Sequence, residues 1–479
     1  MGYSNCLASA HVPPVGWVGP FAALLLLIAI LPLIPKAAHW WERNRNKLLV
    51  ALFLATVTLI HYQTRGYGTI LHDPALAHAV RALGLEAHKE QSHAIAAPGL
   101  ATSAGALGNA LLEYVPFIVL LFALYCISGG IAVRGDIPAR PLTNTSILAL
   151  GGVLANLIGT TGASMLLIRP LLQTNSERKH VAHTVVFFIF IVSNVGGCLL
   201  PIGDPPLFLG YLRGVPFFWT LQLWKEWMFV LGVLLFVYFI SDRRAYRRET
   251  PRDGALDETV VQRVRVIGNV NFVWLALVVA AVATLAPGVV FPGTRWVPPP
   301  FLREAILLAL VGFSFLTTPR RLRRANRFNF HAIAEVACLF IGIFITMQVP
   351  LEILAAKGGE LGLSRPWQFF WVTGGLSGFL DNAPTYAVFF QTANALARQP
   401  GPGVFQLLDG NFIRQDLLVA ISLGAVFMGA VTYIGNGPNF MVRSISEQHG
   451  VRMPSFFSYM LYAVTILVPI HIAVSLIFL

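Results

Sequence analysis

Runs of about twenty apolar residues recur along almost the whole chain, and they constrain its fold more than any other feature. Of the 479 residues, 56% are hydrophobic and only 12% are charged, a composition outside the range of soluble globular proteins. A bilayer core of about 30 Å needs roughly 20 apolar residues per helix. The sequence therefore predicts an all-α polytopic membrane protein with about ten transmembrane helices in a lipid bilayer, and it leaves no sizeable soluble domain.

The apolar runs differ in length and in what interrupts them. We place spans near residues 17–35, 47–63, 111–133, 180–212, 219–240, 270–286, 301–317, 329–350, 413–445 and 455–478. The first lacks a small-residue cleavage motif and is followed at once by another span, so we interpret it as a retained helix. Two further stretches, 143–173 and 366–395, are too long for one span and carry GTTG and DNAP at mid-length. We interpret both as re-entrant hairpins.

The basic residues cluster in short loops between spans, including the runs Arg243–Arg265 and Arg320–Arg327. The positive-inside rule places such loops in the cytoplasm, so the net charge of +12 reflects topology, and we expect no nucleic-acid partner. The same rule predicts a multi-pass protein of the inner (plasma) membrane with its N-terminus outside. Residues 61–110 then form an outward loop with an interfacial amphipathic helix over 74–89. The irregular spacing of its five histidines favours a solvated loop over a metal site.

The chain contains an internal repeat. IGDPPLFL at 202–209 matches IGNGPNFM at 434–441, and NLIGTTGA at 156–163 lies against DNAPTYAV at 381–388. Each repeat consists of a span, a hairpin and a broken span, and the charge topology makes the two repeats inverted, a feature of secondary transporters. The predicted organisation is 1–110, two spans and the outer loop; 111–241, repeat 1; 242–300, the cytoplasmic basic loop and a linking span; and 301–479, repeat 2.

Helix-breaking residues interrupt the repeats inside the apolar runs. The break-forming residues are Gly203, Pro205, Pro206, Pro384, Gly435 and Pro438. Unpaired backbone groups in lipid cost several kcal/mol each, so non-helical backbone persists only where it lines a cavity or binds something. Freed carbonyls suit a hard cation, whereas half-helix N-termini suit an anion. The breaks therefore predict a binding site near the membrane midplane without choosing the sign of its ligand.

Two carboxylates, Asp204 and Asp381, lie at the breaks, and neither motif contains a Lys or Arg. An Asp at mid-membrane costs roughly 2.5 to 3.5 kcal/mol on insertion scales, so it needs a partner or a function. We predict that both coordinate sodium and exchange it for protons; the alternative is that one or both cap a half-helix. Neutral oxygens, each able to bind substrate or to satisfy backbone, come from Asn156, Thr160, Thr161, Asn194, Asn382, Thr385, Asn436 and Asn439.

These motifs resemble those of the ion transporter superfamily, which includes NhaD-type sodium/proton antiporters, arsenite permeases and citrate or dicarboxylate symporters. IGDPPLFL and IGNGPNF are similar to the Gly-Thr-Pro-Pro-Asn segments of the dicarboxylate symporters, and DNAPT at 381–385 resembles the hairpin motif of the NhaD-type antiporters. The resemblance runs from Glu113 to the C-terminus. It implies a homodimer with scaffold and transport domains, elevator-like alternating access, and ion-coordinating or proton-exchanging roles for Asp204, Asp381 and Asn436.

The sequence departs from both relatives. The first hairpin has Asn156-Leu157 where the antiporters have Asp-Asn, and neither hairpin tip has the Ser-Asn-Thr of the dicarboxylate symporters, which counts against citrate bound in their manner. We predict a sodium (or lithium)/proton antiporter with a small inorganic ion as substrate; the alternative is an anion transporter for arsenite or a small carboxylate such as citrate. A non-transporting receptor or enzyme subunit is disfavoured. We expect no catalytic residues and no cofactor besides the transported or coupling sodium ions and protons.

Overall fold

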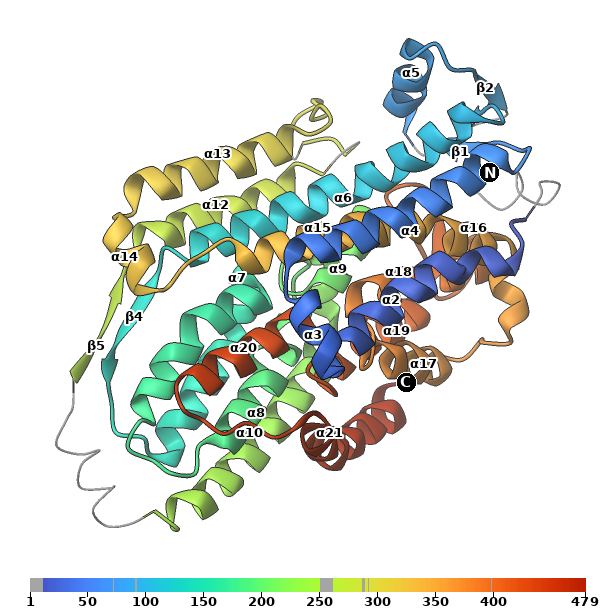
Figure 1. The fold of residues 1–479 in the computed structure, drawn as a ribbon. Coiled ribbons are helices and arrows are strands. Elements are labelled where there is room, and N and C mark those ends of the chain that lie inside the picture. Colours follow the sequence, from blue (N-terminus) through green and yellow to red (C-terminus); the bar gives the residue numbers. More distant parts are fainter. Residues whose placement is uncertain are drawn as a thin grey trace. The chain divides into compact units, whose positions relative to one another are not determined.

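The computed structural model describes residues 12–71, 73–90, 93–249, 262–286, 289–291, 293–397 and 399–479. Helices dominate it (Figure 1), and the chain is an all-α polytopic membrane protein, as predicted. Six helical segments within these ranges are long and apolar enough to cross a membrane, judged by length and composition: Val15–Leu33, Asn44–Thr64, Leu100–Ser128, Pro141–Thr174, Phe217–Tyr246 and Phe456–Phe478. A pair of helices bent by 40°, His331–Thr346 with Gln348–Leu361, is a broken span or a re-entrant loop, and it counts as a seventh segment in the first case.

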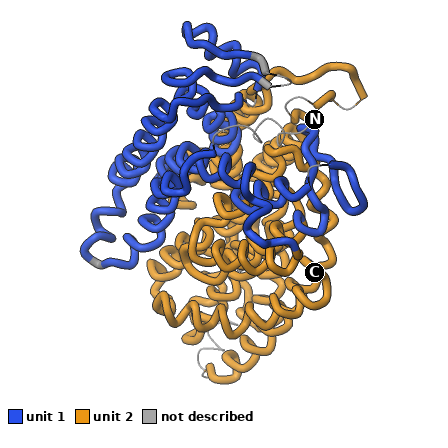
Figure 2. Tube along the Cα trace, turned by 90° about the vertical axis from the view of Figure 1, so that its right-hand side faces the viewer, with its two compact units in different colours: residues 1–118, 329–364, 387–418 blue, residues 119–328, 365–386, 419–479 orange. Residues whose placement is uncertain are grey.

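The chain divides into two compact units (Figure 2), and each is described by itself. Unit 1 comprises residues 1–118, 329–364 and 387–418. Its helices are α2 (Gly19–Ile30), α3 (Pro35–Trp41), α4 (Asn44–Thr64), α5 (Pro74–Ala82), α15 (His331–Thr346) and α16 (Gln348–Lys357), with parts of α6 (Leu100–Ser128), α18 (Asn382–Leu396) and α19 (Gln415–Met428). Its strands are β1 (Thr69–Leu71), β2 (Ala87–Glu90), β3 (His93–Ala96), β6 (Val404–Gln406) and β7 (Phe412–Arg414).

Close packing of α4 against α15 forms the centre of unit 1. A Cβ atom on Gly342 would lie 2.7 Å from the Cβ of Ala51, so the glycine lets the two backbones approach. Lys47 on α4 forms an ion pair with Glu335 on α15, with 2.5 Å between Nζ and Oε1. These contacts tie the second predicted span to a helix almost 300 residues further along the chain.

The segment 61–110, which we predicted to face outward, differs in structure from its prediction. The helix expected over 74–89 ends at Ala82 as α5, because Gly84 adopts φ +75° and turns the chain out of the helix. Residues 87–90 then form β2 in an antiparallel sheet of order β1-β3-β2. Helix α6 begins at Leu100, where we expected a span to start near 111, because the small residues after Gly99 also enter the helix. His72 lies outside the described residues.

Unit 2 comprises residues 119–328, 365–386 and 419–479. Its helices are α7 (Pro141–Thr174), α8 (Ala182–Ile191), α9 (Pro205–Leu212), α10 (Trp224–Tyr246), α12 (Val270–Thr284), α13 (Leu302–Thr317), α14 (Arg320–Ala325), α17 (Pro366–Ser377), α20 (Gly437–Gln448) and α21 (Phe456–Phe478). Short 3-10 helices cover Val195–Cys198 and Phe217–Leu223. Strands β4 (Ala132–Asp136) and β5 (Gln262–Ile267) pair antiparallel, so the end of the run expected as a span to 133 is a strand.

Helix α7 is a closed hairpin. Gly159 interrupts it with φ +75° and ψ 153°, a conformation that favours glycine. A Cβ atom on Gly151 would lie 3.0 Å from Leu167 Cδ1, so residues on the two arms face each other across this turn. At the open end, Asn144 and Asn175 exchange two side-chain hydrogen bonds of 2.9 Å each. The chain therefore folds back on itself at the GTTG motif.

The base of this hairpin is locked to α10 by a buried polar network. The Arg178 guanidinium donates to the Asp242 carboxylate, with 2.7 Å between Nη2 and Oδ1. The Asn144 amide donates to the other carboxylate oxygen of Asp242 at 3.2 Å. His183 completes the contacts, with 2.9 Å between Nε2 and Asp242 Oδ1. Removing one member of such a network would leave a buried charge unpaired, so the network fixes the base of the hairpin against α10.

Candidate functional site

Four interruptions of helix occur in unit 2. They are Gly159 inside α7, residues 192–204 between α8 and α9, residues 378–381 between α17 and α18, and residues 429–436 between α19 and α20. The prolines Pro205 and Pro206 occupy the first helical positions of α9, where a missing N–H removes no hydrogen bond. Pro438 lies at the corresponding place in α20. Pro384 lies in the first turn of α18 and leaves that helix intact.

The two broken spans share a tight loop built on paired glycines. A Cβ atom on Gly203 would lie 2.3 Å from the carbonyl oxygen of Gly197, and one on Gly435 would lie 2.6 Å from that of Gly429. No side chain fits at either place. The two pairs are separated by the same offset of 232 residues that relates IGDPPLFL to IGNGPNFM. Gly197 and Gly429 were not among the predicted break-forming residues, although this offset could have identified them.

Asp204 lies at the centre of the site. It is only 1% exposed, and its carboxylate accepts hydrogen bonds from three other breaks. Thr160 Oγ1 donates to Oδ1 at 2.9 Å, Asn436 Nδ2 donates to Oδ1 at 3.0 Å, and Asn382 Nδ2 donates to Oδ2 at 2.7 Å. The capping alternative does not describe this side chain, because Asp204 is the N-cap residue of α9 but makes no side-chain cap bond.

A backbone hydrogen bond also joins the first hairpin to the first broken span. The Thr160 amide, the first after the hairpin turn, donates to the carbonyl oxygen of Gly203 at 2.8 Å. The first hairpin is thereby joined to the first broken span by both its backbone and a side chain. We call the four side chains Thr160, Asp204, Asn382 and Asn436 the four-break cluster.

Two further asparagines extend the four-break cluster through amide contacts. Asn194 Oδ1 lies 3.2 Å from Asn436 Nδ2, and Asn194 Nδ2 donates to Asn439 Oδ1 at 2.7 Å. Asn439 in turn donates to the carbonyl oxygens of Gly429 at 2.8 Å and Thr432 at 3.0 Å. Both predicted residues therefore lie beside the cluster and hold the loop of the second broken span.

The remaining predicted residues make other contacts. Asp381 accepts from the Ala383 amide at 3.1 Å and so caps α18, and its side chain is partly exposed. Asn156 accepts from the Leu199 amide at 2.7 Å, and Thr385 donates to the Asp381 carbonyl at 2.9 Å. Each of these three satisfies backbone. Thr161, next to Thr160, is partly exposed.

One atom of the four-break cluster has an unused hydrogen-bonding capacity. Asn382 Oδ1 is buried and has no hydrogen-bond partner among the described residues. A buried amide oxygen without a donor is unfavourable by about 1 to 3 kcal/mol. Together with the Asp204 carboxylate, it offers the oxygen ligands that a hard cation prefers. The three donors to Asp204 are neutral, so only dipoles would solvate a charge on it.

Two side chains that were absent from the predicted site hold the second broken span in place. Thr432 Oγ1 donates to the carbonyl oxygen of Gly378 at 2.6 Å and accepts from the amides of Ile434 and Gly435. Ser377 donates to the carbonyl oxygen of Ala425 at 2.7 Å. A single serine or threonine in an apolar run carries little signal, because most of them bond to their own helix.

Most of the chain matches a known protein family. The family model described as "Putative citrate transport" matches residues 87–479. The chain belongs to this family. No curated protein matches the chain. The matched region contains both hairpins and both broken spans, so family membership and the four-break cluster concern the same part of the molecule. Membership agrees with the resemblance to the ion transporter group, and the chain is a multi-pass membrane protein of a transport family.

Proposed function

We propose that the chain is a secondary transporter of a small carboxylate anion of the citrate type, coupled to a cation, sodium or a proton, that binds at Asp204. The family match over residues 87–479 is the observation that carries this proposal, and it favours an anion over the sodium/proton exchange that the motifs alone suggested. The four-break cluster supplies the coupling chemistry.

The donors around Asp204 suggest how a cation and an anion are coupled. In the present structure Thr160, Asn382 and Asn436 all donate to the Asp204 carboxylate, so these groups already hold one anionic group. Charge-assisted bonds of this kind contribute about 1.5 to 3 kcal/mol each. A cation or proton on Asp204 weakens them, and the released donors can then turn to a carboxylate of the substrate. Anion binding would therefore follow neutralisation of Asp204.

Helix dipoles add a second attraction for an anion. The second arm of α7, α9, α18 and α20 all begin at the breaks, and the N-terminus of a helix carries about half a positive charge. This mode of binding differs from one built on Ser-Asn-Thr hairpin tips, which the chain lacks. The unpartnered oxygen of Asn382 is the atom we expect to join Asp204 in holding sodium.

The rest of the proposed organisation rests on the resemblance to the ion transporter superfamily and, for the orientation, on the positive-inside rule. We propose that the hairpins and broken spans move as a transport domain in an elevator-type cycle, that the protein works as a homodimer in the plasma membrane, and that its basic loops face the cytoplasm with the N-terminus outside. We assign it no enzymatic activity. Each of these statements can be tested separately from the choice of substrate.

A sodium (or lithium)/proton antiporter is the second candidate, and one observation favours it. The donors to Asp204 are all neutral, which leaves a buried carboxylate free to exchange a metal ion for a proton. A trivalent anion at the same place would need its charge offset by the coupling cation and the helix dipoles.

Purified protein in proteoliposomes distinguishes the candidates. We expect labelled citrate to accumulate inside under an inward sodium or proton gradient and to stop accumulating when the gradient is collapsed. If citrate and arsenite both fail to accumulate while sodium or lithium drives proton release, antiport replaces the proposal. A protein that does neither would contradict both candidates.

A further inference from the structure

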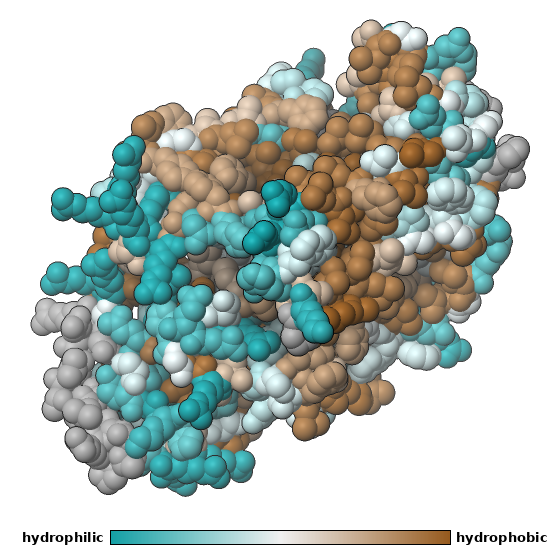
Figure 3. Space-filling view, viewed as in Figure 1, coloured by the Kyte–Doolittle hydropathy of each residue, from teal (hydrophilic) through white to brown (hydrophobic). Residues whose placement is uncertain are grey.

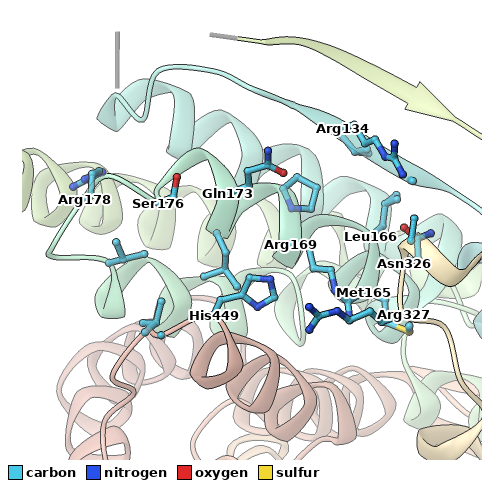
Figure 4. Close-up of a pocket in the computed structure, with 18 of the residues that line it drawn as sticks. Arg134, Met165, Leu166, Arg169, Gln173, Ser176, Arg178, Asn326, Arg327 and His449 are labelled. Carbon is cyan, nitrogen blue, oxygen red and sulfur yellow. The ribbon is translucent and has the colours of Figure 1, made fainter. Parts of the chain in front are cut away.

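A second polar site lies in unit 2, away from the four-break cluster. It is a pocket of about 1030 Å³ between the end of α7, the start of α8, strand β4 and the segments that follow α14 and α20. Figure 4 shows side chains from these elements directed toward one space. In Figure 3 hydrophilic side chains gather over α14, α20 and the β4–β5 ribbon.

The charge of this pocket is one-sided. Its lining includes Arg134, Arg169, Arg178, Lys179, Arg327 and Arg452, and His449, and none of the described residues in that lining is an Asp or Glu. Arg178 is already paired with Asp242 at 2.7 Å, so it is not counted as a ligand group. Clefts lined by one sign of charge concentrate counter-ions, and arginine side chains bind carboxylates and phosphates in a bidentate manner.

Two arginines occupy the middle of the pocket. Figure 4 shows the side chains of Arg169 and Arg327 close together, near enough for their like charges to interact. Arg169 Nε is buried and has no hydrogen-bond partner among the described residues. A guanidinium group whose donor is buried and unpaired, beside a second guanidinium, is in an unfavourable state that a bound oxyanion would relieve.

The backbone of Arg327 has an unfavourable conformation. Its φ of +49° lies in the left-handed region, which is unfavourable by roughly 1 to 2 kcal/mol for a residue with a side chain. The preceding Asn326 fixes this turn, because its side-chain Nδ2 donates to the carbonyl oxygens of Gly129 at 3.0 Å and Ile131 at 2.7 Å. The position of Arg327 at the pocket is therefore built into the fold.

The pocket lies at the far end of the helices that form the four-break cluster. The second arm of α7 runs from Thr160 at the cluster to Arg169 at the pocket, nine residues or about 14 Å of helix. Helix α20 follows Asn436 at one end and leads to His449 at the other. If the cluster lies at the midplane of a core about 30 Å thick, the pocket lies at the membrane surface.

We propose that this basic pocket binds a polyvalent oxyanion, with the guanidinium groups of Arg169 and Arg327 as its clamp. The anion can be dissolved in the aqueous phase or can be the headgroup of an anionic phospholipid, since both present the same oxygens. The proposal goes beyond the transport function and does not depend on which substrate the cluster carries.

Direct binding tests the proposal without a transport assay. In a neutral detergent, equilibrium dialysis of the full chain with labelled pyrophosphate measures the dissolved source; nanodiscs of phosphatidylcholine with and without phosphatidylglycerol, followed by native mass spectrometry, measure the lipid source. We expect Arg169→Gln and Arg327→Gln each to weaken the binding of pyrophosphate or of phosphatidylglycerol by at least tenfold. Arg244→Gln removes an exposed charge outside the pocket and should leave binding unchanged.

A third variant controls for the possibility that the first two misfold. Arg452 is exposed at the pocket lining, so Arg452→Gln should fold normally and weaken binding by a few-fold, with the effect fading at high salt. Loss of pyrophosphate binding supports the dissolved source, and loss of phosphatidylglycerol binding alone supports the lipid source. If neither probe binds, or if binding survives both Arg169→Gln and Arg327→Gln, the proposal is wrong.

Discussion

The two broken spans have similar backbone at the N-caps of their second helices, and at that position one span carries an acid where the other carries an amide. Asp204 and Asn436 are the N-cap residues of α9 and α20, with φ and ψ of −143° and 143° for the first and −152° and 139° for the second. Neither uses its side chain to cap its own helix. Instead the amide of Asn436 donates to the carboxylate of Asp204 at 3.0 Å.

This difference shows why an imperfect repeat is useful. Two carboxylates at these positions would repel each other across a hydrogen-bond distance, and two asparagines would leave no charge to bind a cation. One acid and one amide give an acceptor and a donor that fit together. Substituting one member of this arrangement at a time separates their roles.

Asp204→Asn should have the largest effect. It removes the charge that the cation neutralises and places an amide against the donors of Asn382 and Asn436. Losing a charge-assisted interaction of about 3 kcal/mol corresponds to a roughly 100-fold change. We expect gradient-driven uptake in proteoliposomes to fall by at least that factor, with normal elution in size-exclusion chromatography. Uptake within threefold of the unchanged protein would contradict the role given to this acid.

Asn436→Asp should make the two broken spans alike and unstable at neutral pH. Two carboxylates in contact repel when both are charged and are held together when they share a proton. The stability of this variant should therefore rise as the pH falls from 8 to 5, more steeply than that of the unchanged protein. Thermal unfolding in detergent across this range measures the effect. Parallel pH profiles for the two proteins would show that these side chains do not meet.

Thr160→Val should have an intermediate effect. It keeps the shape of the side chain and removes one donor to Asp204, a loss of about 1.5 kcal/mol, the lower end for a charge-assisted bond, or roughly tenfold in uptake. The neighbouring Thr161→Val is the matched control, because Thr161 has the same chemistry and is partly exposed. We expect less than a twofold change there. Equal effects at both positions would mean that the hydroxyl of Thr160 has no special role.

Changes at Asp381 should be the smallest, which separates it from Asp204. Asp381→Asn keeps an oxygen that can accept from the Ala383 amide, so uptake should change less than about threefold. Asp381→Ala removes the cap and should lower stability by about 1 kcal/mol. A loss of uptake in Asp381→Asn as large as that in Asp204→Asn would return Asp381 to the ion-binding role that its motif suggested.

The sequence predicted the helices well because lipid imposes a strict rule on length and polarity. The broken spans at 180–212 and 413–445 correspond to α8 with α9 and to α19 with α20. The β1-β3-β2 sheet and the β4–β5 and β6–β7 pairs were missed, because the apolar runs from which we predicted spans give no signal for such short strands. The end of α5 and the start of α6 differ from their predicted positions and lie beside Gly84 and Gly99. A single glycine in a sequence does not indicate whether a helix ends there.

The site was harder to predict than the spans. Composition and breaks predicted Asp204, Asn382, Asn436 and Thr160 along with six other oxygen-bearing residues, and only the fold shows which of these ten lie together. Asn156 and Asp381 have the same chemistry as their neighbours, yet each bonds to a nearby backbone amide. Side-chain direction at a break depends on loops such as the Gly197–Gly203 contact, which follows from tertiary packing.

Linkage between cation and anion binding tests the central claim most directly. Citrate affinity of the purified protein can be measured by equilibrium dialysis at a series of sodium concentrations and pH values. If Asp204 couples the two ligands, citrate affinity should rise with sodium or with proton concentration, and sodium affinity should rise with citrate by the same factor. Asp204→Asn should abolish this dependence. A citrate affinity that responds to sodium and pH equally in the unchanged protein and in Asp204→Asn would contradict the account.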